Sequence, residues 1–108
     1  MQDPTTYTEA LALLGSKTRR KLAPNTTLDR QPGGLLTVTL YDTQVVAYYE
    51  SGLVELDTGG HLTSLTVERM NRYLPANARV QRKLGGLLLN RVVVQDGHRF
   101  FPAELETA

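Results

Sequence analysis

The feature that most constrains the fold is a pair of β-rich runs in the first half of the chain. "LLTVTLY" (35–41) and "QVVAYYE" (44–50) are rich in β-branched and aromatic residues, which favour strands. Only Asp42-Thr43 separates them, and this connection is short enough for a hairpin. The two runs therefore predict adjacent antiparallel strands.

Turn signals extend this hairpin on both sides. Ser51-Gly52 supplies a turn before "LVEL" (53–56), and Pro32-Gly33-Gly34 separates a short run at 27–30 from the first long strand. The expected result is a four-stranded meander with one acidic, solvated face and one apolar face. Another element has to cover the apolar face.

The segment "TVERMNRYL" (66–74) is expected to be the helix that covers it. Its apolar residues are spaced to form one stripe, namely Val67, Met70, Tyr73 and Leu74. Ser64 or Thr66 can cap the start of this helix, and Pro75 ends it.

A second group of strands is expected after this helix. The predicted order is a strand at 79–83, a glycine turn near Gly85-Gly86, a strand at 87–94, a hairpin turn at Asp96-Gly97 and a strand at 99–101. The predicted fold class is α+β, with a small antiparallel sheet (the meander plus C-terminal hairpins), a short packed helix and an N-terminal helix.

The N-terminal helix is predicted over residues 4–14. Asp3 and Pro4 resemble an N-cap and a first helical position, and Gly15 resembles a C-cap. The basic tract "SKTRRKLAPN" that follows is interpreted as a solvated linker, with a ligand-binding arm as the alternative. The predicted organisation is an N-terminal helix and basic linker at 1–24, a compact β-rich nucleotide-binding domain at 25–103 and a polar tail at 104–108.

Composition excludes several kinds of site. With 108 residues, no cysteine and only His61 and His98 as histidines, the chain can hold no thiolate metal site, and a zinc site would need carboxylates. No metal site and no cofactor is predicted. Because no apolar run approaches the roughly 18 residues that span a bilayer, no membrane association is expected either.

The formal net charge of +1 hides a segregation of charge along the chain. Residues 29–68 contain six acidic residues and one basic residue, whereas residues 69–99 contain one acidic residue and seven basic ones. Those seven are Arg69, Arg72, Arg79, Arg82, Lys83, Arg91 and Arg99. Such segregation indicates an anion-attracting region, with arginines that are simply solvated on strands as the alternative.

The junction "LDTGGHLTSLTVERMNRYLP" (56–75) is the candidate site. The glycine pair Gly59-Gly60 lets backbone approach a ligand closely, and it delivers His61 and Thr63 to a helix start, where free N–H groups and the helix dipole favour an anion. Arg69 and Asn71 follow on the same helix. A phosphate or a nucleotide would suit such a surface. A histidine in such a turn is more often a partly exposed turn residue than a ligand contact, and for Asn71 a bond to local backbone is as consistent with the sequence as ligand recognition.

The order of residues over 25–83 resembles a family of small proteins encoded by bacteriophages and mobile elements. The matching positions are Asn25-Thr26, Leu28, Arg30, Leu40, Thr43, Val45-Val46, Gly52, Val54, Leu56, Gly59-Gly60, Thr63, Thr66, Arg69 and Asn71. The pattern is also similar to that of the phage Thoeris anti-defence sponges. Those proteins bind, without cleaving, the cyclised ADP-ribose signals of bacterial TIR-domain defence enzymes, and some hold cyclic oligonucleotides.

The resemblance implies specific site residues. The family's site has an aromatic directly after the two glycines, an asparagine on the following helix and a later arginine against the adenine. Here these positions are His61, Asn71 and Arg82, with Lys83 as the neighbour of the arginine. His61 departs from the family pattern, but an imidazole can still stack on a base, with less area than a larger ring.

The resemblance also implies a setting. We expect a phage anti-defence sponge acting in the cytoplasm of a bacterial host cell, as a homodimer or a higher homo-oligomer such as a hexamer, with its pocket at a subunit interface. The alternative is a small β-rich module that binds nucleic acid or a host protein through the arginines of the C-terminal half. An enzyme is not predicted, because no nucleophile, metal set or second base completes a catalytic constellation.

Overall fold

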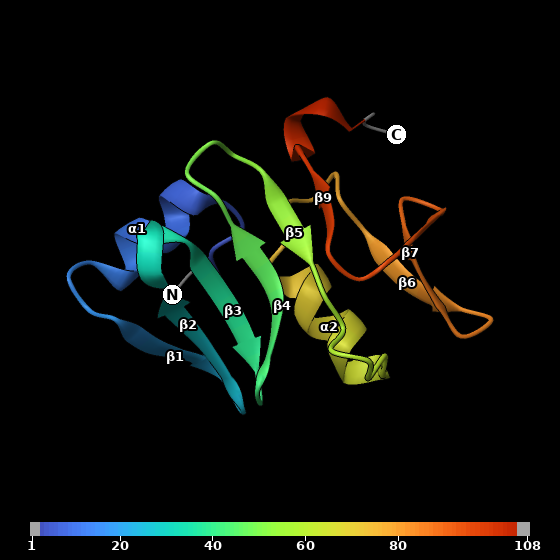
Figure 1. Cartoon of the computed structure of the whole chain (residues 1–108), viewed down its shortest axis with the longest axis horizontal. Helices are drawn as coiled ribbons and strands as arrows, with labels where there is room; N and C mark the ends of the chain where they lie inside the picture. Colours follow the sequence, from blue (N-terminus) through green and yellow to red (C-terminus); the bar gives the residue numbers. More distant parts are fainter. Residues whose placement is uncertain (1–2, 106–108) are drawn as a thin grey trace.

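The computed structural model describes residues 3–105 and has an α+β fold. It comprises two helices, a six-stranded antiparallel sheet and a three-stranded antiparallel sheet (Figure 1). The helices are α1 (Tyr7–Leu14) and α2 (Ser64–Arg72). The strands of the large sheet are β1 (Arg19–Ala23), β2 (Thr26–Arg30), β3 (Leu36–Leu40), β4 (Thr43–Tyr48), β5 (Val54–Leu56) and β9 (His98–Phe100). The strands of the small sheet are β6 (Val80–Lys83), β7 (Gly86–Leu89) and β8 (Val92–Val94).

The predicted four-stranded meander is confirmed as the centre of the large sheet. Its spatial order is β1-β2-β3-β4-β5-β9, and every neighbouring pair is antiparallel. Alternation along the strands puts buried apolar side chains such as Leu28, Val46 and Leu56 on one face. The opposite face carries polar side chains, including Asp29 and Glu55.

Both helices cover the apolar face, as Figure 1 shows for α2 behind β4. Ala10 and Leu14 of α1 and Met70 of α2 belong to the same buried cluster as the inner face of the sheet. Tyr48 on β4 links the sheet to the end of α2 and to the segment before α1. Its hydroxyl lies 2.5 Å from the O of Tyr73, the C-cap of α2, and 3.2 Å from Pro4 O. The prediction that the central helix covers the sheet is confirmed.

The helix boundaries differ from the predicted ones because capping side chains define them. Helix α1 begins at Tyr7, since Thr6 is its N-cap and accepts a hydrogen bond from Glu9 N, and it ends at the predicted C-cap, Gly15. Helix α2 begins at Ser64, since Thr63 and Thr66 form a reciprocal capping box. No helix among residues 3–105 has the length and apolar character needed to cross a membrane.

The basic tract after α1 was predicted to be a solvated linker, and for residues 19–23 this is wrong. These residues form β1, which pairs with β2 along the edge of the large sheet. Arg19 Nε donates to Asp29 Oδ1 at 2.5 Å across this pair, and Arg20 donates to Leu13 O at 3.3 Å. Helix α1 and β1 therefore pack with the rest of the chain, and the compact unit does not begin at residue 25.

The C-terminal strands are also arranged differently from the prediction. Asn90 and Arg91 adopt positive φ angles of 48° and 72°, so the single strand predicted at 87–94 is two strands joined by a tight turn. The predicted hairpin at Asp96-Gly97 does not form, because the strand after it, β9, leaves the small sheet and pairs with β5. A short 3₁₀ turn, Pro102–Glu104, leads into the predicted tail at 104–108, and residues 106–108 lie outside the described part.

Candidate functional site

The glycine turn that follows β5 is held by three acceptor side chains. Asp96 accepts hydrogen bonds from Thr58 N at 2.9 Å and from Thr58 Oγ1 at 2.8 Å. Gly59 N donates to Asp57 Oδ1 at 2.7 Å, and Gly60 N donates to Thr58 Oγ1 at 3.2 Å. The turn is thus fixed by its own chain, and Asp96, which the sequence indicated only as a hairpin residue, is its long-range anchor.

Gly59 is required at this turn for two reasons. Its φ angle is +62°, in the region that side chains rarely adopt. A Cβ on this residue would lie 2.6 Å from Thr43 Oγ1 and 2.8 Å from Thr43 Cγ2. The close backbone approach predicted for the glycine pair is therefore made to β4 of the same chain. Gly60, with φ +80°, has open space where its Cβ would be.

At the start of α2 the capping box occupies the N–H groups of Thr63 and Thr66, and His61 is exposed beside it. Thr63 Oγ1 accepts from Thr66 N at 3.1 Å, and Thr66 Oγ1 donates to His61 O at 3.0 Å. The side chains of His61, Thr63 and Ser64 are all exposed. The predicted delivery of His61 and Thr63 to a helix start is what the turn achieves.

Asn71, in the last turn of α2, hydrogen bonds to the backbone of β6. Its Nδ2 donates to Val80 O at 2.9 Å, and Val80 N donates to its Oδ1 at 2.8 Å. The amide side chain thus satisfies both backbone groups of the first residue of the strand, in the way a neighbouring strand would. Of the two roles considered for Asn71, this geometry corresponds to the bond with local backbone.

Because Asn71 fixes the start of β6 at the end of α2, the strand runs back toward the start of the helix. Arg82, two residues along the strand, reaches that start: its Nη2 donates to Ser64 Oγ at 3.2 Å and its Nη1 to Leu62 O at 3.4 Å. Side chains alternate along a strand, so Lys83 begins on the opposite face from Arg82. The register therefore brings Arg82, and not Lys83, to the helix start.

Arg69 is directed away from this surface and into the protein. Its side chain is 10% exposed, its Nε donates to Thr26 Oγ1 at 2.8 Å, and its Nη2 donates to Pro24 O at 3.3 Å. It also pairs with Glu68. These bonds tie α2 to the β1–β2 turn, so Arg69 supports the site from the far side of the helix.

Most of the C-terminal basic residues are likewise occupied within the fold. Arg72 pairs with Asp3 and Arg99 with Glu55, and Arg79 donates to three backbone carbonyl oxygens. Among residues 3–105, Arg82 and Arg91 form no ion pair with a carboxylate. The charge segregation of the sequence is therefore not a continuous basic surface.

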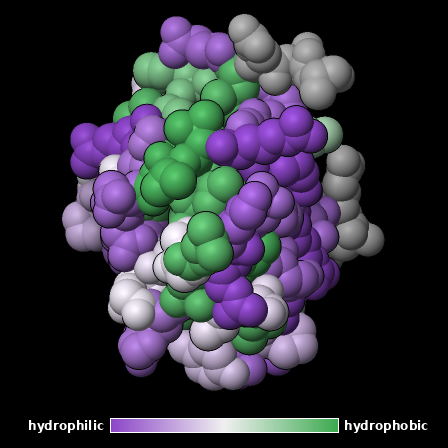
Figure 2. Space-filling model, turned by 90° about the vertical axis from the view of Figure 1, so that its right-hand side faces the viewer, coloured by the Kyte–Doolittle hydropathy of each residue, from purple (hydrophilic) through white to green (hydrophobic). Residues whose placement is uncertain are grey.

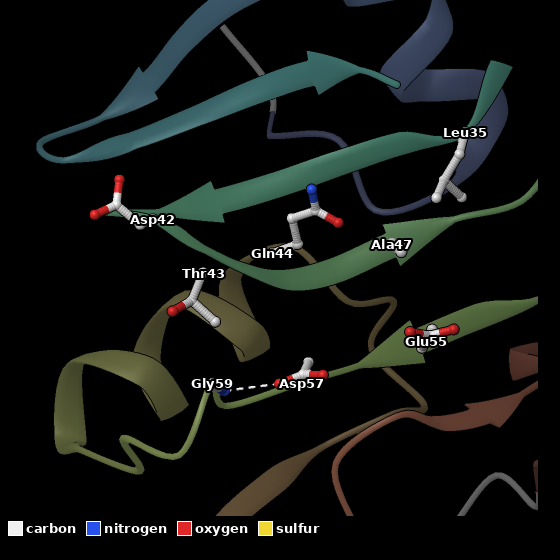
Figure 3. Close-up of a pocket in the computed structure, with 8 residues that line it drawn as sticks. All are labelled: Leu35, Asp42, Thr43, Gln44, Ala47, Glu55, Asp57 and Gly59. Atoms are coloured by element: carbon white, nitrogen blue, oxygen red, sulfur yellow. Dashed lines mark hydrogen bonds between the residues drawn. The ribbon is translucent and has the colours of Figure 1, made fainter. Parts of the chain in front are cut away.

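A shallow cavity of about 310 Å³ lies on the other side of the glycine turn, on the polar face of the large sheet (Figure 3). Its lining contains the carboxylates of Asp42, Glu55 and Asp57, together with Thr43 and Gly59. Three carboxylates, with no basic side chain among the lining residues that the structure describes, make this cavity unsuitable for a phosphate. A guanidinium, that of Arg82, lies instead at the start of α2.

The predicted site residues therefore divide into two groups. Arg82 reaches the start of α2, where His61 and Thr63 are exposed, and Gly59 and Gly60 form the turn that leads into it. Arg69 and Asn71 hold the helix and β6 in place, and Lys83 projects from the other face of the strand. Ser64, which the sequence suggested only as a cap, is the side chain to which Arg82 binds. Comparison of the chain with protein-family models, with curated proteins and with solved structures gave no match.

Proposed function

We propose that the chain binds a cyclic nucleotide signal, such as cyclised ADP-ribose or a cyclic oligonucleotide, at the start of α2 and sequesters it without cleaving it. In this role it acts as a phage anti-defence sponge. The chemical class follows from the site, which offers a cation and a helix start to a phosphate and an exposed imidazole to a base. The identity of the signal follows from the sequence resemblance.

The position of Arg82 is the observation that carries this function. A helix start bears a partial positive charge, and the guanidinium of Arg82 lies against it, where its hydrogen bonds within residues 3–105 go to the neutral groups Ser64 Oγ and Leu62 O. Two positive groups side by side on an exposed surface repel each other unless an anion lies between them. A pyrophosphate held by the guanidinium and the helix start would relieve that repulsion.

His61 supplies the second part of the proposed site. It is exposed next to the carbonyl group of Leu62 that Arg82 binds, so a base stacked on its ring would place the attached phosphates within reach of Arg82. Since Thr63 and Thr66 already hold the first turn of the helix, binding needs little rearrangement of the backbone. A preorganised site of this kind binds more tightly than a site that must be ordered by its ligand.

The alternative, a nucleic-acid module, is less well supported by the arrangement of the arginines. A polymer is bound by many phosphate contacts, but Arg69, Arg72, Arg79 and Arg99 are engaged within the fold. The tract at 17–21, considered as a ligand-binding arm, includes part of the edge strand β1. A compact anion requires only the few groups that remain.

Calorimetry with cyclised ADP-ribose isomers and with cyclic dinucleotides and trinucleotides is the direct test. Replacing Arg82 with Gln should weaken binding by about 10- to 150-fold, which corresponds to the loss of a charge-assisted hydrogen bond. The matched control is Lys83→Gln, which removes the same charge from the adjacent residue on the opposite face and should change affinity little. Failure of all these ligands to bind at tens of micromolar would reject the function.

A second measurement separates sequestration from catalysis. Heat denaturation of the loaded protein should release a nucleotide of unchanged mass, as measured by mass spectrometry. A changed mass would mean that the chain is an enzyme. Binding of mixed oligonucleotides with steep salt dependence, without binding of cyclic nucleotides, would favour the nucleic-acid module.

A further inference from the structure

The first strand of the large sheet, β1, has an outer edge whose backbone groups face away from the sheet (Figure 1). Arg30 N donates to Thr18 O at 2.9 Å, so the carbonyl group just before β1 faces β2. Successive residues of a paired strand alternate between bonding to their neighbour and pointing away from it. In the register of β1 with β2, Arg20 therefore bonds to β2, and the N–H and C=O groups of Arg19 and Lys21 point outward.

The side chains along this edge are basic. Four of the five residues 17–21 are lysine or arginine, and none is acidic. Arg19 and Lys21 lie opposite Asp29 and Thr27 of β2, so both project from the polar face of the sheet. Arg19 pairs with Asp29, whereas Lys21 is exposed and forms no ion pair with a carboxylate in the part of the chain that the structure describes.

We propose that β1 is a docking edge for an extended acidic segment of a partner protein, which adds an antiparallel strand to the large sheet. The partner residues opposite Arg19 and Lys21 are two positions apart, so their side chains lie together on the polar face. Acidic residues at these two positions pair with the basic side chains, and their backbone groups bond to the outward groups of β1. In strand addition of this kind, main-chain bonds give affinity and side chains give specificity.

Charge favours this occupant over the two other chains that an open edge could attract. A second copy of β1 would place basic side chains opposite basic side chains, which is destabilising. The phosphates of a nucleic acid accept hydrogen bonds but do not donate them, so they would leave the outward C=O groups of Arg19 and Lys21 unpaired. An acidic peptide strand supplies both the donors and the acceptors.

The opposite side of the molecule, which carries the small sheet, has a different surface chemistry. Figure 2 shows this side, where apolar side chains form a band between polar ones. Val92 and Val93 of β8 are each 64% exposed, so apolar peptides have another surface to bind. Charge is therefore the property that should direct a peptide to β1.

The docking edge is separate from the proposed anion site. Strands β1 and β5, the second of which leads into the glycine turn, are four spacings apart in the order β1-β2-β3-β4-β5. This is roughly 19 Å at about 4.8 Å for each spacing. Peptide binding should therefore be the same with and without cyclised ADP-ribose isomers, and it does not depend on the proposed function.

The test is titration of the full chain with a blocked peptide, Thr-Val-Glu-Val-Glu-Val-Thr, at low ionic strength. The expected Kd is on the order of 100 µM. Methylation of the backbone nitrogens of both glutamates removes the donors that face β1 and should weaken binding about tenfold or more. The matched control is methylation of the valine nitrogen between them, which points away from β1 and should change affinity little. A peptide with the two glutamates adjacent, and so on opposite faces, should bind more weakly.

Hydrogen exchange followed by NMR locates the bound peptide. With about 1 mM peptide, roughly ten times the expected Kd, the amides of Arg19 and Lys21 should exchange about tenfold more slowly. The amide of Arg20, which already faces β2, should change little. Lys21→Glu should weaken peptide binding about tenfold. Lys83→Glu, the same change at an exposed position of β6, is the matched control and should leave binding intact.

Circular dichroism reports whether each variant is folded. Absence of binding at about 1 mM peptide overturns the proposal. So does binding that methylation of the glutamates does not weaken, or protection of another strand in place of β1. An oligonucleotide that protects the amides of Arg19 and Lys21 when the peptide does not would assign this edge to nucleic acid instead.

Discussion

Replacing Asn71 with Ala should destabilise the fold through the loss of two hydrogen bonds. The side chain donates to Val80 O at 2.9 Å and accepts from Val80 N at 2.8 Å, and the side chain of Val80 is buried. Each bond contributes about 1 kcal/mol, and an unpaired backbone group next to a buried residue adds a desolvation cost, so the expected loss is about 2 to 3 kcal/mol. This is a large fraction of the roughly 5 to 15 kcal/mol that stabilises a typical domain.

Urea unfolding followed by circular dichroism measures this loss. Asn71→Asp should destabilise the protein at neutral pH at least as much as Asn71→Ala, because a carboxylate would face the carbonyl oxygen of Val80. The control is Gln81→Ala, at an exposed position on the same strand, which should stay within about 0.5 kcal/mol of wild type. If Asn71→Ala unfolds like wild type and loses only ligand binding, Asn71 is a ligand contact and the structural account of it is wrong.

Three further perturbations test other parts of the structure. Gly59→Ala should lower the free energy of unfolding by about 2 to 4 kcal/mol, because it adds both backbone strain and a collision with Thr43. Gly60→Ala should add only the strain and lower the free energy of unfolding by about 1 to 2 kcal/mol. Equal losses for the two variants would contradict the collision. Tyr48→Phe should lower the free energy of unfolding by about 1 to 3 kcal/mol, because the buried hydroxyl of Tyr48 donates to Tyr73 O. Tyr73→Phe should leave the melting temperature unchanged or raise it, because the buried hydroxyl of Tyr73 has no partner among the described residues. Burial tends to raise the pKa of Asp29, but hydrogen bonds from Arg19, Thr27 and Thr39 prevail, and the pKa is lowered from 3.8. The Asp29 carboxylate therefore contributes its full stabilisation above pH 3.8, and this stabilisation is lost as the pH falls through the lowered pKa. Asp29→Asn should flatten the acid side of a plot of stability against pH, below about pH 4.

The local elements were predictable because their signals lie within a few residues of one another. The hairpin between β3 and β4 follows from two β-rich runs and a short connection, and the apolar stripe of α2 follows from helical spacing. The break between β7 and β8 was missed because "LLLNRVVV" reads as one run. Only the positive φ angles of Asn90 and Arg91 divide it, and asparagine is a residue that adopts such angles readily.

Long-range pairing could not be predicted in the same way. The Asp96-Gly97 signal is typical of a hairpin, but Asp96 accepts from Thr58, 38 positions earlier, and Gly97 N donates to Leu56 O at 2.8 Å. Those contacts direct β9 to β5. Likewise, the basic character of residues 19–21 suggested a solvated tract, although charged residues are common on edge strands and Asp29 is the partner that holds Arg19 there.

The site illustrates why a count of arginines is a poor guide to a binding surface. Seven basic residues lie between positions 69 and 99, yet Arg69 and Arg79 are bonded within the fold and two more are in ion pairs. What distinguishes Arg82 is its neighbour, because it lies at the positive end of a helix and forms no ion pair with a carboxylate of the described residues. Asn71 creates this arrangement by fixing β6 against α2, so a change at Asn71 should alter anion affinity through the position of Arg82. A double-mutant cycle between the two residues would then show strong coupling, whereas additive effects would mean that each contacts the ligand independently.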